Sequence, residues 1–384
     1  MKQFYPLSTF LTEYSEKNGV NAYRPVAVGR YGIRTRESIY SKELAKDYSK
    51  NKLIHKNTLT VGMGSAQIDI GVLTDDITYS VSPAYHTYKI AGVNAEYLRY
   101  CLECRNQDMF SRFVKRGSRQ GKTIDLKRWM TYEIPVYDEN RQQEIVDRLN
   151  RISELIEKRQ EQLVQLSELV KSRFIELFGD PDGNPMNWET AELERHLEIV
   201  GGFAFKSEGF TESGIPVLRI GNINSGHFLP VNMVFWPDDP SLARYKMYPG
   251  DLVMSLTGTV GKDDYGNVCV LSDEYPEYYL NQRNAKLAIG ATLNRHYLSE
   301  MLKFSRIKKR LTGISRGVRQ ANISNRDILA LRVPIPPIKL QEQFATFVEQ
   351  TDKSKYYSSL SFRYCQAAAN TYRQEWMTCR TSDF

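Results

Sequence analysis

The residues whose types and spacing could carry chemistry are arginines and amides on two glycine-containing loops. Residues 116–120 read Arg-Gly-Ser-Arg-Gln, and residues 316–320 read Arg-Gly-Val-Arg-Gln. A guanidinium group binds phosphate or guanine, a glutamine amide can pair with adenine, and glycine lets the backbone approach DNA. The loops and the strands that follow them therefore predict nucleic-acid contacts at Arg116, Arg119, Gln120, Lys122, Arg316, Arg319, Gln320 and Asn322.

Each of these loops belongs to a basic stretch of the chain. Residues 105–128 contain eight Lys or Arg against two Asp, and residues 301–326 contain eight Lys or Arg and no acid. One basic stretch is usually an ordinary solvated face, but two matching stretches favour a polyanionic partner. The 384 residues carry a net charge of only +7, so the positive charge is local.

Other glycine-containing turns present short polar or basic side chains that could contact base edges. Ordinary turns have the same composition, and that alternative stays open. The candidates in the first half are Arg30, Tyr31, Arg34, Arg36, Ser65 and Gln67. The candidates in the second half are Arg219, Asn222, Asn224, His227, Thr257, Thr259 and Lys262.

The sequence lacks the usual motifs of catalysis and cofactor binding. Leu256–Asp264 resembles a phosphate-binding loop but has leucine in place of its first glycine and aspartate after its lysine. Asn184–Asn187 lacks the second proline and the aromatic residue of an amino-methyltransferase motif. Cys101 and Cys104 form a single CxxC, and the five histidines lack ligand spacing. We therefore expect no catalytic residue, no metal and no cofactor in this chain.

The elements that must position the two loops occur twice. Arg116–Leu149 matches Arg316–Val348 at an offset of about 200 residues, with a one-residue deletion. Ala95–Glu103 and Arg295–Lys303 match at the same offset. Each half thus consists of a variable region, a basic helix, an arginine–glycine loop, a short strand that ends in proline, and a long helix.

The two long helices are predicted to pair. From near Glu139 to about Phe178, apolar residues recur at alternating steps of four and three, which is typical of a coiled coil. The second helix starts after Pro337, and its equivalent positions are polar in the middle. We expect antiparallel pairing through Ile145, Leu149, Ile152, Ile156, Leu163, Leu166, Val170, Phe344, Val348, Phe362, Ala369 and Trp376.

These patterns predict an α+β protein of mixed α/β character. Two globular regions are separated by two long antiparallel coiled-coil helices, related by a pseudo-two-fold repeat. The chain has no run of 18 apolar residues, so we expect no membrane span. Its five cysteines are an odd, sparse set that suits a reducing cytoplasm.

Several sequence segments together resemble the specificity subunits of type I restriction–modification enzymes. They are Lys171–Glu189, Ile215–Ile223, Gly250–Lys262, Leu280–Leu287, and the loop at 316 with the strand and helix that follow it. The resemblance implies two target-recognition domains, residues 1–137 and 179–336. It also implies two spacer helices, residues 138–178 and 337–384.

The resemblance implies a non-catalytic subunit that reads a split target on double-stranded DNA. Two methyltransferase subunits that use S-adenosylmethionine would dock on it, and two nuclease–translocase subunits that use ATP and Mg²⁺ could join. Such complexes lie in the cytoplasm of bacteria or archaea. Residues 23–57 and 215–250 differ strongly, so the two half-sites should differ.

Two other functions stay open. The chain could be a stand-alone or fused DNA adenine methyltransferase or restriction enzyme with unfamiliar motifs. It could also be a coiled-coil scaffold without a DNA role. The polar positions Thr351, Lys355 and Ser358 further leave open whether the two helices pair along their whole length.

Overall fold

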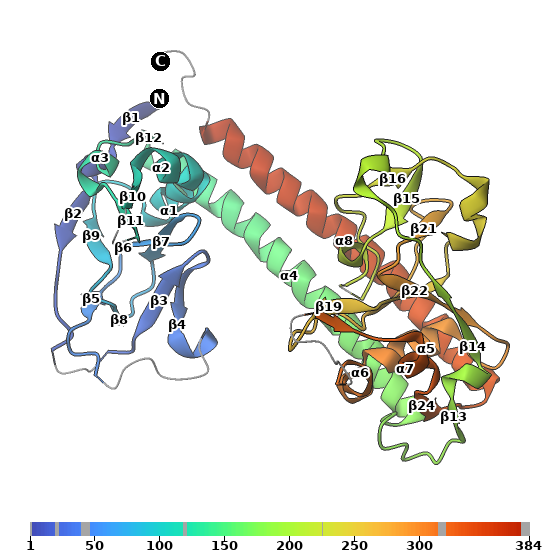
Figure 1. The fold of residues 1–384 in the computed structure, drawn as a ribbon. Helices are drawn as coiled ribbons and strands as arrows, with labels where there is room; N and C mark the ends of the chain where they lie inside the picture. The colour runs from blue at the N-terminus through green and yellow to red at the C-terminus, as the bar shows by residue number, and fades with distance from the viewer. Residues whose placement is uncertain are drawn as a thin grey trace. The chain divides into compact units, whose positions relative to one another are not determined.

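The computed structural model describes residues 2–19, 23–39, 47–117, 121–224, 226–313 and 320–377. By packing, the chain forms two compact units (Figure 1). Unit 1 comprises Met1–Gln160 and Leu360–Phe384, and unit 2 comprises Glu161–Ser359. The division falls inside both long helices, so each helix contributes to both units. The domain boundaries expected from the sequence stay a prediction.

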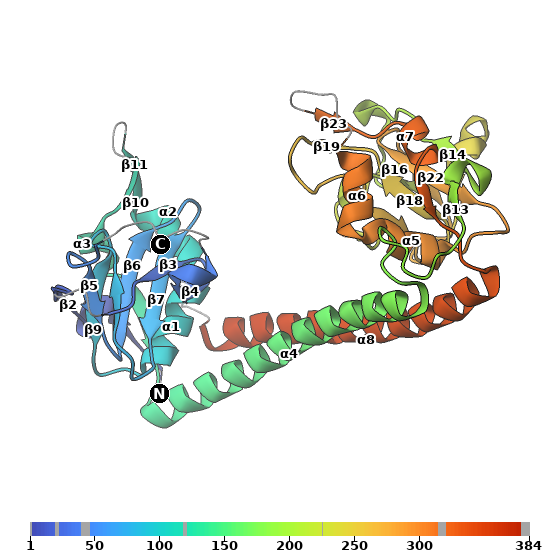
Figure 2. The same cartoon turned by 90° about the horizontal axis from the view of Figure 1, so that it is seen from below.

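Unit 1 is built on a four-stranded antiparallel sheet of order β2-β9-β6-β7, covered by two helices (Figure 2). The sheet consists of β2 (Leu11–Tyr14), β9 (His86–Ile90), β6 (Thr58–Met63) and β7 (Ile68–Leu73), and the helices are α1 (Ala95–Cys104) and α2 (Asn106–Phe113). Smaller elements are β1 (Gln3–Pro6) with β12 (Glu133–Val136), β3 (Val26–Gly29) with β4 (Gly32–Thr35), β5 (Lys52–Ile54) with β8 (Tyr79–Val81), β10 (Val114–Gly117) with β11 (Gly121–Ile124), and α3 (Leu126–Trp129).

Unit 2 has a sheet of the same size, order β14-β22-β18-β20, and two helices beside it. These are β14 (Leu197–Gly201), β22 (Asn284–Ile289), β18 (Leu252–Ser255), β20 (Val268–Val270), α5 (Arg295–Lys303) and α6 (Ser305–Thr312). Smaller elements are β13 (Thr190–Glu192) with β24 (Arg332–Pro334), β19 (Thr257–Thr259) with β23 (Gln320–Asn322), and α7 (Asn325–Leu329). Unit 2 also has a second sheet of β16 (Phe235–Trp236), β15 (Ile215–Leu218), β21 (Tyr278–Leu280) and β17 (Lys246–Met247). In unit 1, a parallel bridge between Pro25 and Ser80 joins the β3–β4 and β5–β8 pairs in the same way.

The predicted repeat is confirmed down to single hydrogen bonds. The hydroxyl of Tyr97 on α1 donates to the Pro135 carbonyl at 2.8 Å, and the equivalent Tyr297 on α5 donates to the Pro334 carbonyl at 2.9 Å. Both hydroxyls are buried, and burial raises the pKa of each phenol. Because a buried hydroxyl needs a partner, each tyrosine ties a helix to the strand that leads into a long helix.

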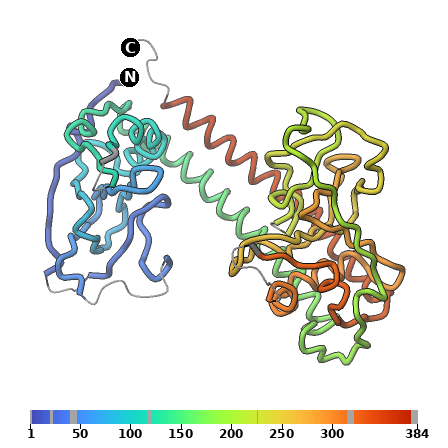
Figure 3. The backbone as a smooth tube through the Cα atoms, viewed as in Figure 1, coloured from blue at the N-terminus to red at the C-terminus, as the bar shows by residue number. Residues whose placement is uncertain are grey.

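The predicted long helices are confirmed as α4 (Glu139–Phe178) and α8 (Ile338–Met377). In unit 1, the start of α4 packs with the end of α8 in one core, through Ile145 and Trp376 among others. In unit 2, the end of α4 packs with the start of α8, through Val170 and Phe344. The pairing is therefore antiparallel, as predicted, and the tube in Figure 3 traces both helices.

The seam positions are buried at the helix ends and half-buried between them. Ile145, Leu149, Val170, Phe344, Val348, Ala369 and Trp376 are buried, and Ile152, Ile156, Leu163, Leu166 and Phe362 are half-buried. Thr351 and Ser358 of the polar middle are also buried, at 6% and 5% exposed. The Thr351 hydroxyl donates to the Phe347 carbonyl at 2.9 Å, so this threonine is packed without an unpaired polar atom and does not face open water.

The heptad pattern missed two fully buried residues at the end of α4, Phe174 and Phe178. Phe174 stacks on Tyr297 with ring centroids 5.3 Å apart, and both phenylalanines meet Phe344 edge-on. These rings lie in the core of unit 2 together with the seam residues Val170 and Phe344, so at this end α4 buries more than the predicted seam positions. Among the described residues, no helix combines the length and apolar character that crossing a membrane requires.

This packing predicts opposite results for two adjacent residues. Replacing buried Phe174 with alanine should lower the free energy of unfolding by about 3–5 kcal/mol, because an aromatic core side chain leaves a cavity. Replacing Ile175, which is 42% exposed, with alanine should change it by less than about 1 kcal/mol. Urea unfolding followed by circular dichroism measures both, and equal losses would contradict this orientation of α4.

Candidate nucleic-acid interface

In unit 2, two loops singled out from the sequence lie side by side. Strand β19 pairs antiparallel with β23, so that Thr257 lies opposite Asn322 and Thr259 opposite Gln320 (Figure 2). The Ile323 amide donates to the Leu256 carbonyl at 2.9 Å and extends this pairing. The strand that leaves the arginine–glycine loop is thereby joined to the turn that follows the central strand β18.

Unit 1 repeats this arrangement with other side chains. Lys122, on the strand β11 that follows the first arginine–glycine loop, donates to the Ser65 carbonyl in the turn after β6. Its ammonium group also lies 5.3 Å from the centroid of the Phe110 ring. Gln67, in the same turn, is half-buried. Both units therefore place a polar turn against the returning strand of the loop, but with lysine in one and asparagine in the other.

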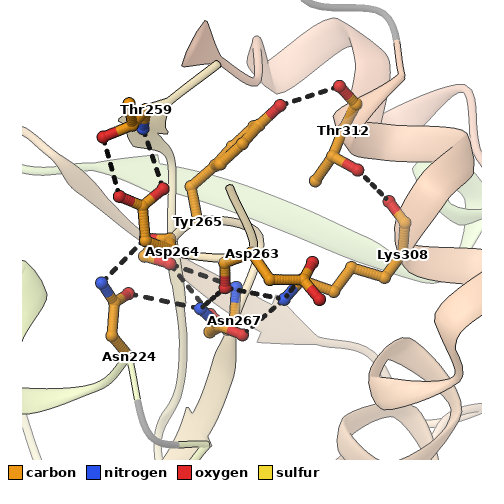
Figure 4. Close-up of polar contacts among 9 residues, drawn as sticks. Asn224, Thr259, Asp263, Asp264, Tyr265, Asn267, Lys308 and Thr312 are labelled. Atoms are coloured by element: carbon orange, nitrogen blue, oxygen red, sulfur yellow. Dashed lines mark hydrogen bonds and ion pairs between the residues drawn. The ribbon is translucent and has the colours of Figure 1, made fainter. Parts of the chain in front are cut away.

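The turn after β19 is held by an internal carboxylate (Figure 4). Asp264 accepts hydrogen bonds from the amide of Thr259 at 2.8 Å and from its hydroxyl at 2.9 Å. The amide bond is the main reason that the pKa of Asp264 lies below its usual value. A Cβ at Gly258 would overlap the same carboxylate, so glycine is required there.

A lysine and two asparagines hold the other side of this turn (Figure 4). Lys308 on α6 donates to the Asn267 side chain at 2.8 Å and to the Asp263 carbonyl at 3.2 Å. Asn224 donates to the Asp264 carbonyl at 2.8 Å. Two residues expected to face DNA, Asn224 and Thr259, thus also stabilise the turn itself.

Asn222 is a correction to the sequence-based interpretation. Its side chain is 1% exposed. The amide donates to the carbonyls of Leu229 and Val231 at 3.0 and 2.9 Å, and its oxygen accepts from the Arg219 amide at 3.0 Å. It therefore builds the loop that follows β15 and is not available to a base. Arg219 itself donates to the Asn232 carbonyl.

The hairpin of β3 and β4 presents the aromatic candidate. Tyr31 lies in the two-residue turn between Gly29 and Gly32 and is 68% exposed. The guanidinium groups of Arg30 and Arg34 lie 5.7 and 4.7 Å from its ring centroid. Arg36, in contrast, lies over the Tyr48 ring at 5.1 Å and is half-buried.

Fewer cations of the two basic stretches, residues 105–128 and 301–326, are unpaired than their composition implies. Lys303 pairs with Glu300, Arg306 with Asp182 and Lys308 with Asp263. In unit 1, Arg112 pairs with Asp108 and Lys115 with Asp125. Acids from outside residues 301–326 therefore neutralise part of that stretch, and the sequence window alone overstated its charge.

The remaining candidates are placed as follows. Ser65, His227, Lys262 and Asn322 are exposed. Arg116 and Gln320 belong to β10 and β23. Arg119, Gln120, Arg316 and Arg319 lie outside the described residues. The predicted contacts of all of them with DNA stay predictions.

In the CxxC pair on α1, Cys101 is buried and Cys104 is half-buried. Burial raises the pKa of the Cys101 thiol above its usual range and that of Cys104 to about 11. Both are therefore protonated near neutral pH and are not reactive thiolates. Across the described residues, no group of three or more His, Cys, Asp or Glu could hold a metal ion.

The turn between β21 and β22 lies in the segment Leu280–Leu287, which carries part of the family resemblance, but none of its residues was predicted to contact DNA. Gln282 and Arg283 are exposed there, beside an open depression of about 510 Å³. Leu256, Thr257, Asn322, Ile323, Ser324 and Asn325 form the rest of its lining. Two adjacent polar residues directly after an aromatic, buried strand were the available signal, because such a pair must lie in a surface turn.

The fold defines a class of protein in which two related α+β units share a pair of long antiparallel helices. The model of the family described as type I restriction modification DNA specificity domain matches residues 11–166 and 185–356. The chain belongs to this family.

Curated relatives and a solved structure agree with this assignment. The chain is 25% identical over 174 residues to a putative type I restriction enzyme specificity subunit, MjaX, of Methanocaldococcus jannaschii. This match covers 44% of this chain and 40% of that protein. It is 22% identical over 183 residues to the StySPI specificity subunit of Salmonella potsdam, covering 44% and 38%. The matches thus span about two fifths of these relatives. The crystal structure of a type I restriction–modification S subunit from M. genitalium has the same fold, with a TM-score of 0.60 at 14% identity, over 99% of this chain and 97% of that one.

The two neighbouring aspartates of the β19 turn predict different effects. Asp264→Ala removes the acceptor of the Thr259 amide, so hydrogen exchange at that amide should become roughly tenfold faster. The Asp263 side chain is 94% exposed and meets only Lys308, at 3.3 Å, so Asp263→Ala should leave the exchange nearly unchanged. Hydrogen exchange measured by NMR compares them. Unchanged exchange in Asp264→Ala would show that the carboxylate does not hold the turn.

Proposed function

We propose that this chain is the DNA sequence-recognition subunit of a type I restriction–modification complex and supplies no catalytic residue. The observation that carries the proposal is that, in each unit of a specificity-domain fold, a polar turn contacts the strand that leaves an arginine–glycine loop. The contact is strand pairing in unit 2 and the hydrogen bond from Lys122 to Ser65 in unit 1. Two copies of one scaffold suit two half-sites of a split target. Each copy offers the amides and cations that read base edges and phosphates.

The two half-sites differ in this proposal. Unit 1 presents Lys122 and the Tyr31 hairpin, whereas unit 2 presents Asn322 and Thr257. Lysine donates hydrogen bonds only, but asparagine both donates and accepts. Unlike side chains at equivalent positions support an asymmetric, bipartite double-stranded DNA target.

The candidate DNA contacts of the proposal are the sequence-predicted residues other than Asn222. Those with described side chains are Arg30, Tyr31, Arg34, Arg36, Ser65, Gln67, Lys122, Arg219, Asn224, His227, Thr257, Thr259, Lys262 and Asn322. Of these, the exposed side chains are those of Arg30, Tyr31, Arg34, Ser65, His227, Thr259, Lys262 and Asn322, and they are the strongest candidates because they reach solvent.

The catalytic work would belong to partner subunits in a bacterial or archaeal cytoplasm. Two methyltransferase subunits would bring S-adenosylmethionine, and two nuclease–translocase subunits, where present, would use ATP and Mg²⁺. Exposed apolar side chains on the long helices support docking of protein partners, since such residues are costly to leave in water. Val164 on α4 is 58% exposed, and Tyr357 on α8 is 69% exposed.

Methylome sequencing tests the proposal directly. DNA from a host that expresses this chain with its methyltransferase subunit should carry methyladenine in one motif, with two unequal specified halves and an unspecified gap. The methyltransferase subunit expressed alone should leave no such motif and serves as the control. Methylation without sequence preference would instead favour a scaffold without a DNA role. Methylation by this chain alone would favour a methyltransferase.

The long helices predict the length of the gap. One heptad inserted after Gln160 in α4 and one after Ser359 in α8 preserves the seam and lengthens each helix by about 10 Å. At about 3.4 Å per base pair, the gap in the methylated motif should widen by about three base pairs. The same seven residues inserted after exposed Asp273 should leave the gap unchanged. An unchanged gap after the helix insertions would show that these helices do not set the spacing between the half-sites.

A further inference from the structure

We infer that the turn Asn281–Asn284 reads bases of the half-site bound by unit 2, with Gln282 and Arg283 as specificity-determining residues. The inference rests on the proposed function and assigns it to two residues of the segment Leu280–Leu287 that were not among the predicted DNA contacts. Its basis is a depression of about 510 Å³ that this turn forms together with β19 and the end of β23.

The turn is held by its backbone. The Leu256 amide donates to the Arg283 carbonyl at 2.8 Å, and the Gln282 amide donates to the Phe203 carbonyl at 2.9 Å. A Cβ at Gly202 would overlap the backbone of Asn281, so the two segments lie as close as backbones can. Beyond these main-chain bonds, the Asn281 side-chain oxygen accepts from the Arg283 amide at 3.1 Å, and the buried Asn284 side chain donates to the Leu218 carbonyl at 2.8 Å. The side chains of Gln282 and Arg283 take no part in holding the turn.

Four polar side chains around the depression are free, in contrast to those of the β19 turn, whereas Ser324 in the same lining donates to Asp327 at 2.7 Å. Gln282, Arg283, Asn322 and Asn325 are exposed. Within the part of the chain that the structure describes, none of these four side chains makes a hydrogen bond or ion pair. Arg283 is the only charged group in the lining. The surface is therefore polar, positive and unsatisfied.

One buried group in the lining also lacks a partner. The Thr257 hydroxyl is out of contact with solvent and has no hydrogen-bond partner among the described residues. A polar atom in this state is costly unless something binds it. It lies on β19 opposite Asn322, beside the free amides. Since it does not reach solvent, a base edge cannot contact it in this structure, and the inference rests on the exposed amides and Arg283.

The chemistry matches the edges of base pairs. Arg283 can donate two parallel hydrogen bonds to guanine, and the amide of Gln282 or Asn322 can donate to and accept from adenine. A phosphate, in contrast, has only acceptors and would leave the amide oxygens unpaired. A mixed set of donors and acceptors around one cation thus favours base recognition.

Substitutions at this turn test the inference in the purified complex of the chain with its methyltransferase subunit. The wild-type complex first defines the motif on duplex DNA. Each base of the motif is then varied singly, and methyl transfer is measured. Arg283→Ala and Gln282→Ala should each lower discrimination about tenfold to a hundredfold at a position in one half-site. The other half-site and the gap should keep their preferences.

Two further variants separate base reading from charge. Arg283→Lys keeps the charge but loses the planar fork, so it should lose discrimination as Arg283→Ala does. Arg326 is exposed on the neighbouring α7 but does not line the depression, and Arg326→Ala should keep the preference at every position. Thermal unfolding should be unchanged in all four variants.

The possible failures are distinguishable. A wild-type complex with a split motif, together with Arg283→Ala and Gln282→Ala variants of full discrimination, would overturn this inference and leave the proposed function standing. The same holds if Arg283→Ala weakens all substrates equally and Arg283→Lys restores them, because the arginine would then contact phosphate. A wild-type complex without any motif would overturn the proposed function and this inference together.

Discussion

The junction between each globular unit and its long helix depends on one buried glutamine. Gln142 accepts from the Asn94 amide at 2.9 Å and donates to the Tyr137 carbonyl at 2.7 Å. Gln341 makes the equivalent bonds in unit 2, to the Asn294 amide at 2.8 Å and the Pro336 carbonyl at 2.7 Å. If a buried amide side chain loses either partner, the free energy of unfolding falls by about 1–3 kcal/mol. This geometry fixes the direction in which the long helix leaves the unit, and with it every contact along the seam.

The positions of the candidate DNA-contacting loops follow from the same scaffold, because the segment between the sheet and the long helix must return past the central strand. In unit 2, this places β23 on β19; in unit 1, it places β11 beside the turn after β6. The scaffold determines where the loops lie but not which side chains they carry. A protein built this way can change its ligand by substitution at the loops while the buried tyrosine and glutamine contacts stay the same.

The sequence predicted what local patterns determine and missed what distant packing determines. The bounds of α4 and the start of α8 were predictable, because heptad spacing and the residues at the helix ends are local signals. Phe174 was not, because its burial depends on Tyr297 and Phe344, which only the fold brings near. Asn222 looked like a base-reading residue because a short amide in a turn has the same local sequence whether it faces water or the interior. Its hydrogen bonds to the carbonyls of Leu229 and Val231 show that it faces the interior.

Charge within unit 2 shows why a basic stretch is a weak guide to the residues that recognise a ligand. Lys308 forms an ion pair with Asp263 and donates a hydrogen bond to Asn267, and so stabilises a turn. Arg283 lies outside the basic stretch, yet its guanidinium is exposed beside free amides. A cation already paired inside the protein has to break that pair before it can bind a base or a phosphate, whereas an unpaired one loses only water. Availability of the side chain therefore selects the contact residues better than the density of positive charge along the sequence.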